Sequence, residues 1–198
     1  TRALLQAGVN VRVFSLTRGE YYEPVLQAMG IHPQWIGQYS NPIIRLVALM
    51  LSLYNFRPHI LQSTHFYVNL YVSLVAPIYN AIGVGSIRSD IFFEMKSNPT
   101  WGKLLLKVPK VLIANSQLAQ HNAKILRINP EKIFYLPNVI DLADFDRQYA
   151  RAKNLAVNAE FESRIVIASV GRMVPAKRFD RFINSLAIAC REMPEITG

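Results

Sequence analysis

Cysteine and acidic residues are both scarce in this sequence. Cys190 is the single cysteine among 198 residues, and it falls on the apolar side of an expected helix. We therefore interpret it as a reduced core thiol in a reducing compartment, rather than as half of a disulfide or as a nucleophile. Lys and Arg outnumber Asp and Glu by 22 to 13, which gives a net charge of +9. That charge favours an acidic partner such as nucleic acid, anionic lipid or a phosphorylated substrate.

The sequence also lacks the signatures of several kinds of enzyme. It contains no Walker A and no G-x-S-x-G sequence, which argues against a P-loop nucleotide site and against an α/β-hydrolase. None of the four histidines has a Cys or His partner at metal-ligand spacing. We therefore expect no metal site.

Charged residues are absent from residues 58–87, so a membrane span must be considered there. Asn69, Ser73 and Pro77 interrupt this apolar run and argue against a span. A strand, a buried helix and a second strand account for the run better. The apolar residues 43–55 are too few to cross a bilayer, so we expect a helix packed into the domain.

Helix-like and strand-like segments alternate along the chain. Gly8 and Gly30 mark helix ends, whereas Asn41-Pro42 and Ser116 mark helix starts. Apolar runs predict strands at residues 9–16, 31–36, 57–62, 84–88, 111–115 and 133–136. The alternation predicts an α/β fold, with a Rossmann-like parallel sheet and helices on both faces.

A further strand and helix are expected near the C-terminus. The apolar residues 165–170 are typical of a parallel strand buried on both faces, and Gly171 permits a sharp turn after it. The helix that follows Pro175 carries apolar residues at helical spacing: Phe179, Phe182, Ile183, Leu186 and Cys190. A helix N-terminus after a strand and turn suits an anion, and Arg172 and Lys177 flank that point. Two ordinary surface cations on a turn remain the alternative.

The segment Val170-Gly-Arg-Met-Val-Pro-Ala-Lys177, followed by an amphipathic helix, resembles the start of the C-terminal domain of retaining GT-B glycosyltransferases of the "group 1" kind (glycosyltransferase family 4). Three more motifs match that family in sequence and spacing: Ile113-Ala-Asn-Ser116, Pro130-Glu-Lys-Ile133 and Pro137-Asn-Val-Ile-Asp141. Val139 stands where the family usually has Gly. Because a β-branched residue disfavours a positive φ, this loop should turn without a left-handed residue.

The resemblance implies a function and a set of site residues. Gly171, Arg172 and Lys177 would bind the diphosphate of a UDP- or GDP-linked sugar. The sugar would pass, with retention and without metal or cofactor, to a glycan or lipid-linked acceptor. Family members carry a His near the position of Asp90, so Asp90 is one candidate catalytic residue, and a surface ion pair with Arg88 is the alternative for it. His65 is the other candidate, because it follows a family-like strand and could face the cleft, and a hydrogen-bonded helix-cap histidine is the alternative for it. The residues expected to line the cleft are Arg88, Ser116, Asn138 and Asp141.

The resemblance also implies a domain organisation. We expect an acceptor-side domain over residues 1–146, a connection over residues 147–163, and the start of a donor-binding domain over residues 164–198. The first strand of the family, with its glycine-rich loop, would precede residue 1, and most of the second domain would follow residue 198. No basic and apolar leader is visible at the start. A cytoplasmic location is expected.

A basic segment lies between Trp101 and Lys110. Lys103, Lys107 and Lys110 recur at helical spacing with leucines between them, which predicts either a solvated lysine face or a peripheral contact with an anionic membrane. Two other functions remain open, a nucleotide-sugar epimerase of the same fold and a basic nucleic-acid-binding module. The family-like motifs favour transfer. The interleaved aromatic and basic residues of nucleic-acid-binding modules are lacking, so no nucleic-acid partner is expected.

Overall fold

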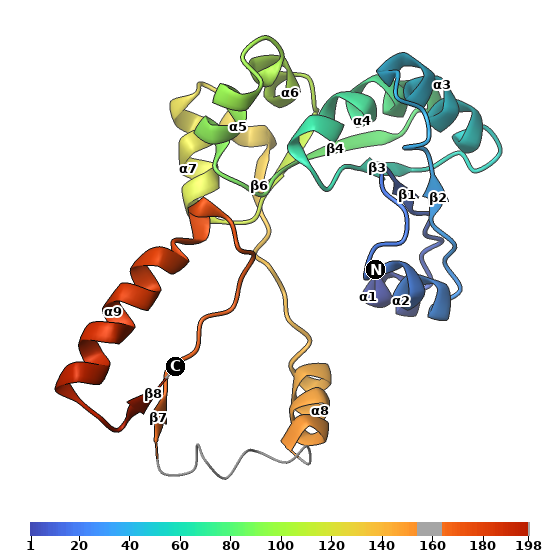
Figure 1. The fold of residues 1–198 in the computed structure, drawn as a ribbon. Helices are drawn as coiled ribbons and strands as arrows, with labels where there is room; N and C mark the ends of the chain where they lie inside the picture. The colour runs from blue at the N-terminus through green and yellow to red at the C-terminus, as the bar shows by residue number, and fades with distance from the viewer. Residues whose placement is uncertain (154–163, 198) are drawn as a thin grey trace. The chain divides into compact units, whose positions relative to one another are not determined.

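The computed structural model describes residues 1–153 and 164–197. These residues form two compact units, Thr1–Asn138 and Val139–Gly198, which are drawn from blue to red in Figure 1.

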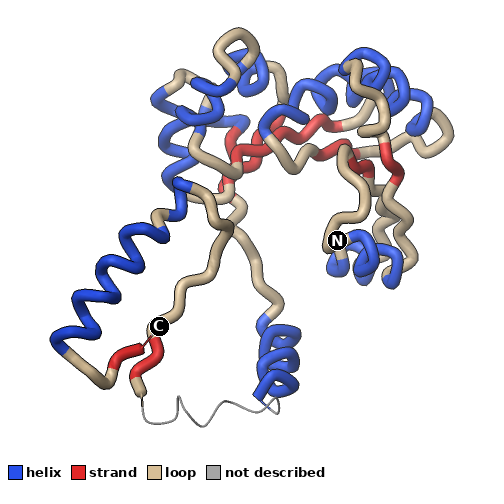
Figure 2. The backbone as a smooth tube through the Cα atoms, in the orientation of Figure 1, coloured by secondary structure: helices blue, strands red, loops and turns tan. Residues whose placement is uncertain are grey.

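Parallel strands form the centre of the first unit. Four of them follow one another in the order β3-β4-β5-β6, as the red segments of Figure 2 show. Their bounds are Ile60–Gln62 for β3, Ile82–Ile87 for β4, Val111–Ala114 for β5 and Ile133–Tyr135 for β6. A separate parallel pair is made by β1 (Phe14–Ser15) and β2 (Gln34–Trp35). The expected parallel α/β arrangement is confirmed, although the first strand is much shorter than residues 9–16.

Helices connect these strands and cover both faces of the sheet arrangement. The α-helices are α1 (Arg2–Gln6), α2 (Glu23–Ala28), α3 (Pro42–Leu53), α4 (Asn69–Val75), α5 (Ile91–Ser97), α6 (Gly102–Lys107) and α7 (Gln117–Ile125). Short 3-10 turns are η1 (Phe66–Val68), η2 (Ala76–Tyr79) and η3 (Pro130–Lys132). None of the helices in the part of the chain that the structure describes is long and apolar enough to cross a membrane.

The helix boundaries follow the predicted capping residues. Gly8 and Gly30 end α1 and α2 in the left-handed region, at φ of 75° and 77°. Asn41 Oδ1 accepts a hydrogen bond from the Ile43 N–H at 2.8 Å, and Ser116 Oγ accepts one from the Ala119 N–H at 3.1 Å. These side chains satisfy backbone donors that a helix start leaves unpaired, so both N-cap predictions are confirmed.

The main core lies around β4 and β5. Ile87, Leu112 and Ala114 are fully buried there, together with Leu106 from α6 and Ala123 from α7. Gly85 of β4 is a place of close approach, because a Cβ there would lie 2.8 Å from the Leu112 side chain. A smaller cluster forms where α3 meets α4.

Helix α3 is packed into the first unit, as expected, but along one side only. Only Leu49 and Leu53 are buried, and a row of apolar side chains on the other side of the helix is exposed. A helix buries only the stripe that faces its neighbours, and α3 has neighbours on one side.

The second unit contains α8 (Leu142–Lys153), β7 (Ile165–Val166), the 3-10 turn η5 (Pro175–Lys177), α9 (Phe179–Glu192) and β8 (Ile196–Thr197). The expected helix is present as α9, but it begins later than Pro175, because Pro175–Lys177 forms the separate turn η5 and the left-handed Arg178 divides that turn from α9. The expected six-residue strand buried on both faces is wrong: β7 has two residues, both about half exposed, because among the described residues only β8 pairs with it. Helix α8 runs across residue 146, and residues 154–163 of the expected connection lie outside the described part.

Candidate functional site

Except for Asp141, which precedes α8, the predicted site residues fall in two places, one in each unit. Residues 63–65, 88–90 and 115–116 follow β3, β4 and β5 at the carboxyl edge of the four-stranded sheet. Open parallel sheets bind ligands beyond this edge. Residues 171–178 form the loop before α9.

A buried hydrogen-bonded cluster ties β3 to β4 at the carboxyl edge. Asn69, the first residue of α4, is completely buried, and its Oδ1 accepts hydrogen bonds from the Ser86 N–H at 2.8 Å and from the Ser63 hydroxyl. Its Nδ2 donates to the Ser86 carbonyl at 3.1 Å. The amide side chain therefore pairs with Ser86 much as another strand would, at the point where β3 has ended. Sequence reasoning missed this role of Asn69.

His65 lies two residues after Ser63, at the start of η1. Its imidazole is exposed and stacks on the ring of Tyr67, with the ring centroids 5.6 Å apart. The His65 carbonyl accepts from the Val68 N–H at 3.1 Å, which fixes the turn. An exposed imidazole beside an aromatic ring at this edge is free to contact a ligand.

Asp90 caps α5. Its Oδ1 accepts a hydrogen bond from the Phe92 N–H at 2.9 Å, so capping the helix is sufficient to explain an Asp at this position. The alternative that Asp90 pairs with Arg88 is not met, since no ion pair joins them in the described chain, and both side chains are exposed. Ser89 between them donates to Glu94 Oε1 at 2.6 Å.

Ser116 and Asn138 follow the next two strands. The Ser116 hydroxyl is committed to capping α7, and Asn138 is exposed after β6 at the end of the first unit. Val139 does not have a positive φ, which confirms that this loop turns without a left-handed residue.

Gly171 and Lys177 are close together in the loop before α9. A Cβ built on Gly171 would lie 3.7 Å from the Lys177 Cδ and 3.6 Å from Phe179, so the lysine stem passes alongside the glycine backbone. The Arg172 and Lys177 side chains are exposed. Gly171 does not adopt a positive φ; the left-handed residue of this turn is Arg178, at φ of 51°. The loop presents two cations next to a helix N-terminus, which is the composition that an anion needs.

Arg178 and Asp180 form a forked ion pair at this helix start. Arg178 Nε and the terminal NH2 nitrogen donate to the two Asp180 oxygens at 3.0 and 2.8 Å. This hydrogen bonding raises the pKa of Arg178 and lowers the pKa of the Asp180 carboxyl. The pairing neutralises one arginine of the loop, so Arg172 and Lys177 carry its net positive charge.

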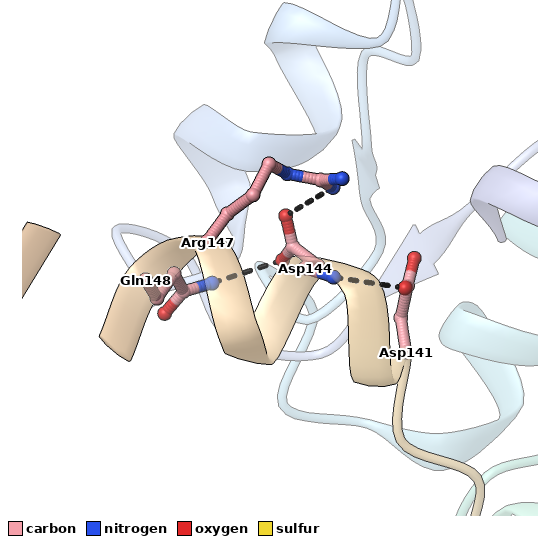
Figure 3. Close-up of polar contacts among 4 residues, drawn as sticks. All are labelled: Asp141, Asp144, Arg147 and Gln148. Atoms are coloured by element: carbon pink, nitrogen blue, oxygen red, sulfur yellow. Dashed lines mark hydrogen bonds and ion pairs between the residues drawn. The ribbon is translucent and has the colours of Figure 1, made fainter. Parts of the chain in front are cut away.

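Asp141 directly precedes α8 in the second unit. Its carboxylate accepts from the Asp144 N–H at 3.0 Å, and Asp144 accepts in turn from Arg147 at 3.0 Å and Gln148 at 2.9 Å (Figure 3). Asp144 and Asp146 form an Asp-x-Asp pair that the sequence analysis did not single out. Because residues two apart on a helix point away from each other, this pair is poorly placed to bind one ion. Residues 1–153 and 164–197 contain no group of three metal-ligating side chains.

The lysine-bearing segment forms a helical hairpin of α5 and α6. Leu105 faces the core as predicted, and Leu106 is buried as well, whereas Leu104, which was also expected on the core side, is exposed beside the lysines, as is Trp101. Lys132 adds a cation by donating to the carbonyls of Lys107 at 2.6 Å and Pro109 at 3.1 Å. Burial, and then the charge of Lys107, lower the pKa of Lys132.

Comparison with known proteins gives structural matches only. No protein-family model matches the sequence, and neither does any curated protein. The chain is similar to crystal structures of HepE from Anabaena. Against HepE with UDP and glucose the TM-score is 0.70 at 13% identity, covering 93% of this chain and 51% of that chain. Against HepE with UDP-glucose the TM-score is 0.66 at 13% identity, covering 90% of this chain and 49% of that chain.

A third HepE structure, in complex with UDP, gives a TM-score of 0.65 at 15% identity. The chain spans about half the length of HepE (49–51%). At this identity the likeness shows the fold, and it confirms the expected Rossmann-like class of GT-B proteins.

Proposed function

We propose that the chain belongs to a glycosyltransferase that transfers a hexose from a nucleoside-diphosphate sugar with retention, using neither metal nor cofactor. The fold that the chain shares with HepE supports this, since HepE was crystallised with UDP and with UDP-glucose. The observation that carries the proposal is the loop before α9, where the Lys177 stem lies against Gly171 and Arg172 is adjacent.

This loop suits the chemistry of transfer. When the bond between the anomeric carbon and the diphosphate breaks, negative charge grows on the leaving phosphates. Arg172 and Lys177 supply fixed positive charge there, and the start of α9 adds the positive end of a helix dipole. In this proposal both residues bind the diphosphate of a UDP- or GDP-linked donor.

The acceptor would bind at the carboxyl edge of the four-stranded sheet. His65 is exposed there and can contact a sugar, and Arg88 and Asp90 follow the neighbouring strand. We assign His65 and Asp90 to the reacting end of the acceptor, and Arg88, Ser116, Asn138 and Asp141 to the walls of the cleft. The acceptor is a glycan or a lipid-linked sugar.

A lipid-linked acceptor fits a peripheral position at the cytoplasmic membrane surface. Trp101 is 58% exposed beside Lys103 and Lys107, which is the composition of an interfacial helix. Three lysines near anionic headgroups contribute roughly 1 kcal/mol each, so binding should be weak and sensitive to salt.

Calorimetric titration tests the donor site. The chain is titrated with UDP, with GDP and with a short DNA duplex. Arg172→Ala and Lys177→Ala should each weaken nucleotide binding about 10- to 150-fold, because each removes a charge-assisted contact of roughly 1.5–3 kcal/mol. Arg191→Ala, which removes an equal charge from the last turn of α9, is the matched control and should bind normally.

The outcomes separate the alternatives. Binding of DNA alone would favour a nucleic-acid-binding module and refute the transferase. Conversion of a radiolabelled nucleotide sugar into its epimer, without transfer to any acceptor, would favour the epimerase. Unchanged nucleotide affinity in both loop variants would remove the basis for the donor site.

A further inference from the structure

An exposed apolar row runs along α3. Its members are Ile43, Val47, Leu51 and Tyr54, which recur at helical spacing and are between 46% and 72% exposed. Leu49 and Leu53 lie on the opposite side of the helix and are buried. Soluble proteins rarely leave a whole helical stripe of large apolar side chains in water, so such a face indicates a binding surface.

A groove of about 600 Å³ continues this row. Leu51 and Tyr54 of α3 form one wall, and Ile78 and Tyr79 of η2 form the other. The groove lies where the chain enters β3 and β4, at the amino edge of the sheet. The predicted acceptor residues lie at the carboxyl edge, so the groove is a separate site.

Arg57 supplies a cation at the end of the groove. It lies in the turn after α3, four residues beyond Leu53, and adopts a left-handed backbone at φ of 46°, where glycine or asparagine is usual. Its guanidinium makes no hydrogen bond or ion pair with the residues that the structure describes. No Asp or Glu occurs anywhere in residues 24–89. The surface is therefore apolar, with positive charge and no negative charge from its own segment.

We propose that this α3 face, defined as Val47, Leu51, Tyr54, Arg57 and Ile78, docks on the surface of an anionic lipid membrane. Leucine and isoleucine side chains bury their apolar area at the headgroup boundary, and tyrosine suits that boundary because its ring is apolar and its hydroxyl is polar. Arg57 is placed to contact lipid phosphate. The proposal concerns membrane binding alone and holds whether or not the chain transfers sugars.

Charge distinguishes lipid from other occupants. A two-fold dimer would bring this patch against its own copy, and Arg57 would face a surface that offers no carboxylate from residues 24–89. Nucleic acid needs several free cations, but Arg45 of α3 already donates to the carbonyls of Tyr39 and Ser40, and Arg12 donates to the Ser52 carbonyl at 3.4 Å and lies over the Phe56 ring. An anionic bilayer matches both the apolar area and the cation Arg57.

The position of α4 links this face to the lysines of α6. Helix α4 packs against α3 and against α6, so the three helices belong to one layer of the first unit. The α3 face would supply apolar contacts, and the α6 lysines would supply charge. Their contributions should therefore respond differently to salt.

Vesicle co-sedimentation of the 198-residue chain tests the proposal. The vesicles are phosphatidylcholine alone or phosphatidylcholine mixed with phosphatidylglycerol, each at low and physiological salt. The double variant Val47→Gln/Leu51→Gln should bind mixed vesicles at least about tenfold more weakly at both salt concentrations, because two exposed apolar contacts are lost. Arg57→Gln should weaken binding to mixed vesicles only.

The matched control is Leu118→Gln/Ile125→Gln on α7, which removes two apolar side chains of similar exposure from another helix. It should bind within about twofold of the wild type, since a surface substitution away from the docking face leaves partitioning unchanged. All five side chains to be changed are exposed, so the variants should fold, and circular dichroism confirms this.

Three results would overturn the proposal. One is a wild-type chain that ignores mixed vesicles at low salt. Another is equal binding by the α3 and α7 double variants. The third is a concentration-dependent dimer that Val47→Gln/Leu51→Gln dissolves, because the face would then be an interface between copies of this chain.

Discussion

Removing the Asn69 side chain should destabilise the first unit more than any exposed substitution. In Asn69→Ala, the Ser86 N–H and carbonyl lose their partners while remaining buried, and the Ser63 hydroxyl keeps only a long contact with the Val84 carbonyl at 3.5 Å. A buried group left without a partner costs about 1–3 kcal/mol, so we expect a loss of about 3–5 kcal/mol in the free energy of unfolding.

Urea denaturation followed by tryptophan fluorescence measures this loss. Trp35 and Trp101 are the only tryptophans and both lie in the first unit, so the signal reports that unit alone. The matched control is Asn122→Ala on α7, whose side chain makes no hydrogen bond with the described residues. A loss below about 1 kcal/mol for Asn69→Ala, at an unchanged denaturant slope, would refute the idea that this amide ties β3 to β4.

Three further predictions concern charge and backbone strain. The lowered pKa of Lys132 means that charging it disfavours the folded state, so stability should rise as the pH increases through that pKa towards 10.5, and Lys107→Gln should flatten this rise in urea titrations. The pKa of Asp180 is lower in the folded state than its ordinary value of 3.8, so the ionised carboxylate stabilises the fold above pH 3.8, and this stabilisation is lost as the pH falls through the lowered pKa. Arg178→Ala should raise the pKa of Asp180 in a carboxyl NMR titration. Arg127→Gly should increase stability by about 0.5–1 kcal/mol in urea unfolding, because the residue sits at φ of 59° after α7.

Local rules explain which parts of the fold could be read from the sequence. The helix starts at Asn41 and Ser116 depend on a side-chain acceptor and an N–H two or three residues away. The helix ends at Gly8 and Gly30 depend on the conformational freedom of one residue. Such features need no distant partner, so sequence reasoning located them correctly.

Burial could not be predicted in the same way, because it depends on what packs against each segment. Residues 165–170 have the composition of a buried strand, but only Ile165 and Val166 pair with β8, and both remain half exposed. The same limit applies to α3, whose apolar residues on nearly every side did not indicate which side would pack against the domain. The role of Asn69 left a weak signal, since an amide within an apolar, uncharged run is costly to bury without partners.

Some features of the candidate site follow from local rules in the same way, and others do not. Those at the carboxyl edge were located by the strand pattern, and the capping role of Asp90 follows from its place before α5. The Arg178–Asp180 pair was missed because its geometry requires Arg178 to adopt a left-handed backbone, which an arginine rarely does. That conformation is specified by the fold of the turn and not by the residue itself.

The two candidate regions differ in how many buried residues support them. The carboxyl edge of the first unit rests on fully buried groups, whereas in the described part of the second unit Ile196 alone is buried and Met173 of the loop is 80% exposed. A segment with so few buried contacts opens at little cost in free energy.

Nucleotide binding should stabilise this loop first. A nucleotide at a hundred times its dissociation constant stabilises the bound form by about 2.7 kcal/mol, and the effect should be largest in the least stable part that the nucleotide contacts. UDP should therefore slow amide hydrogen exchange in residues 171–179 more than in β5. Equal slowing in both would mean that the nucleotide stabilises the chain globally and that the loop is already ordered without it.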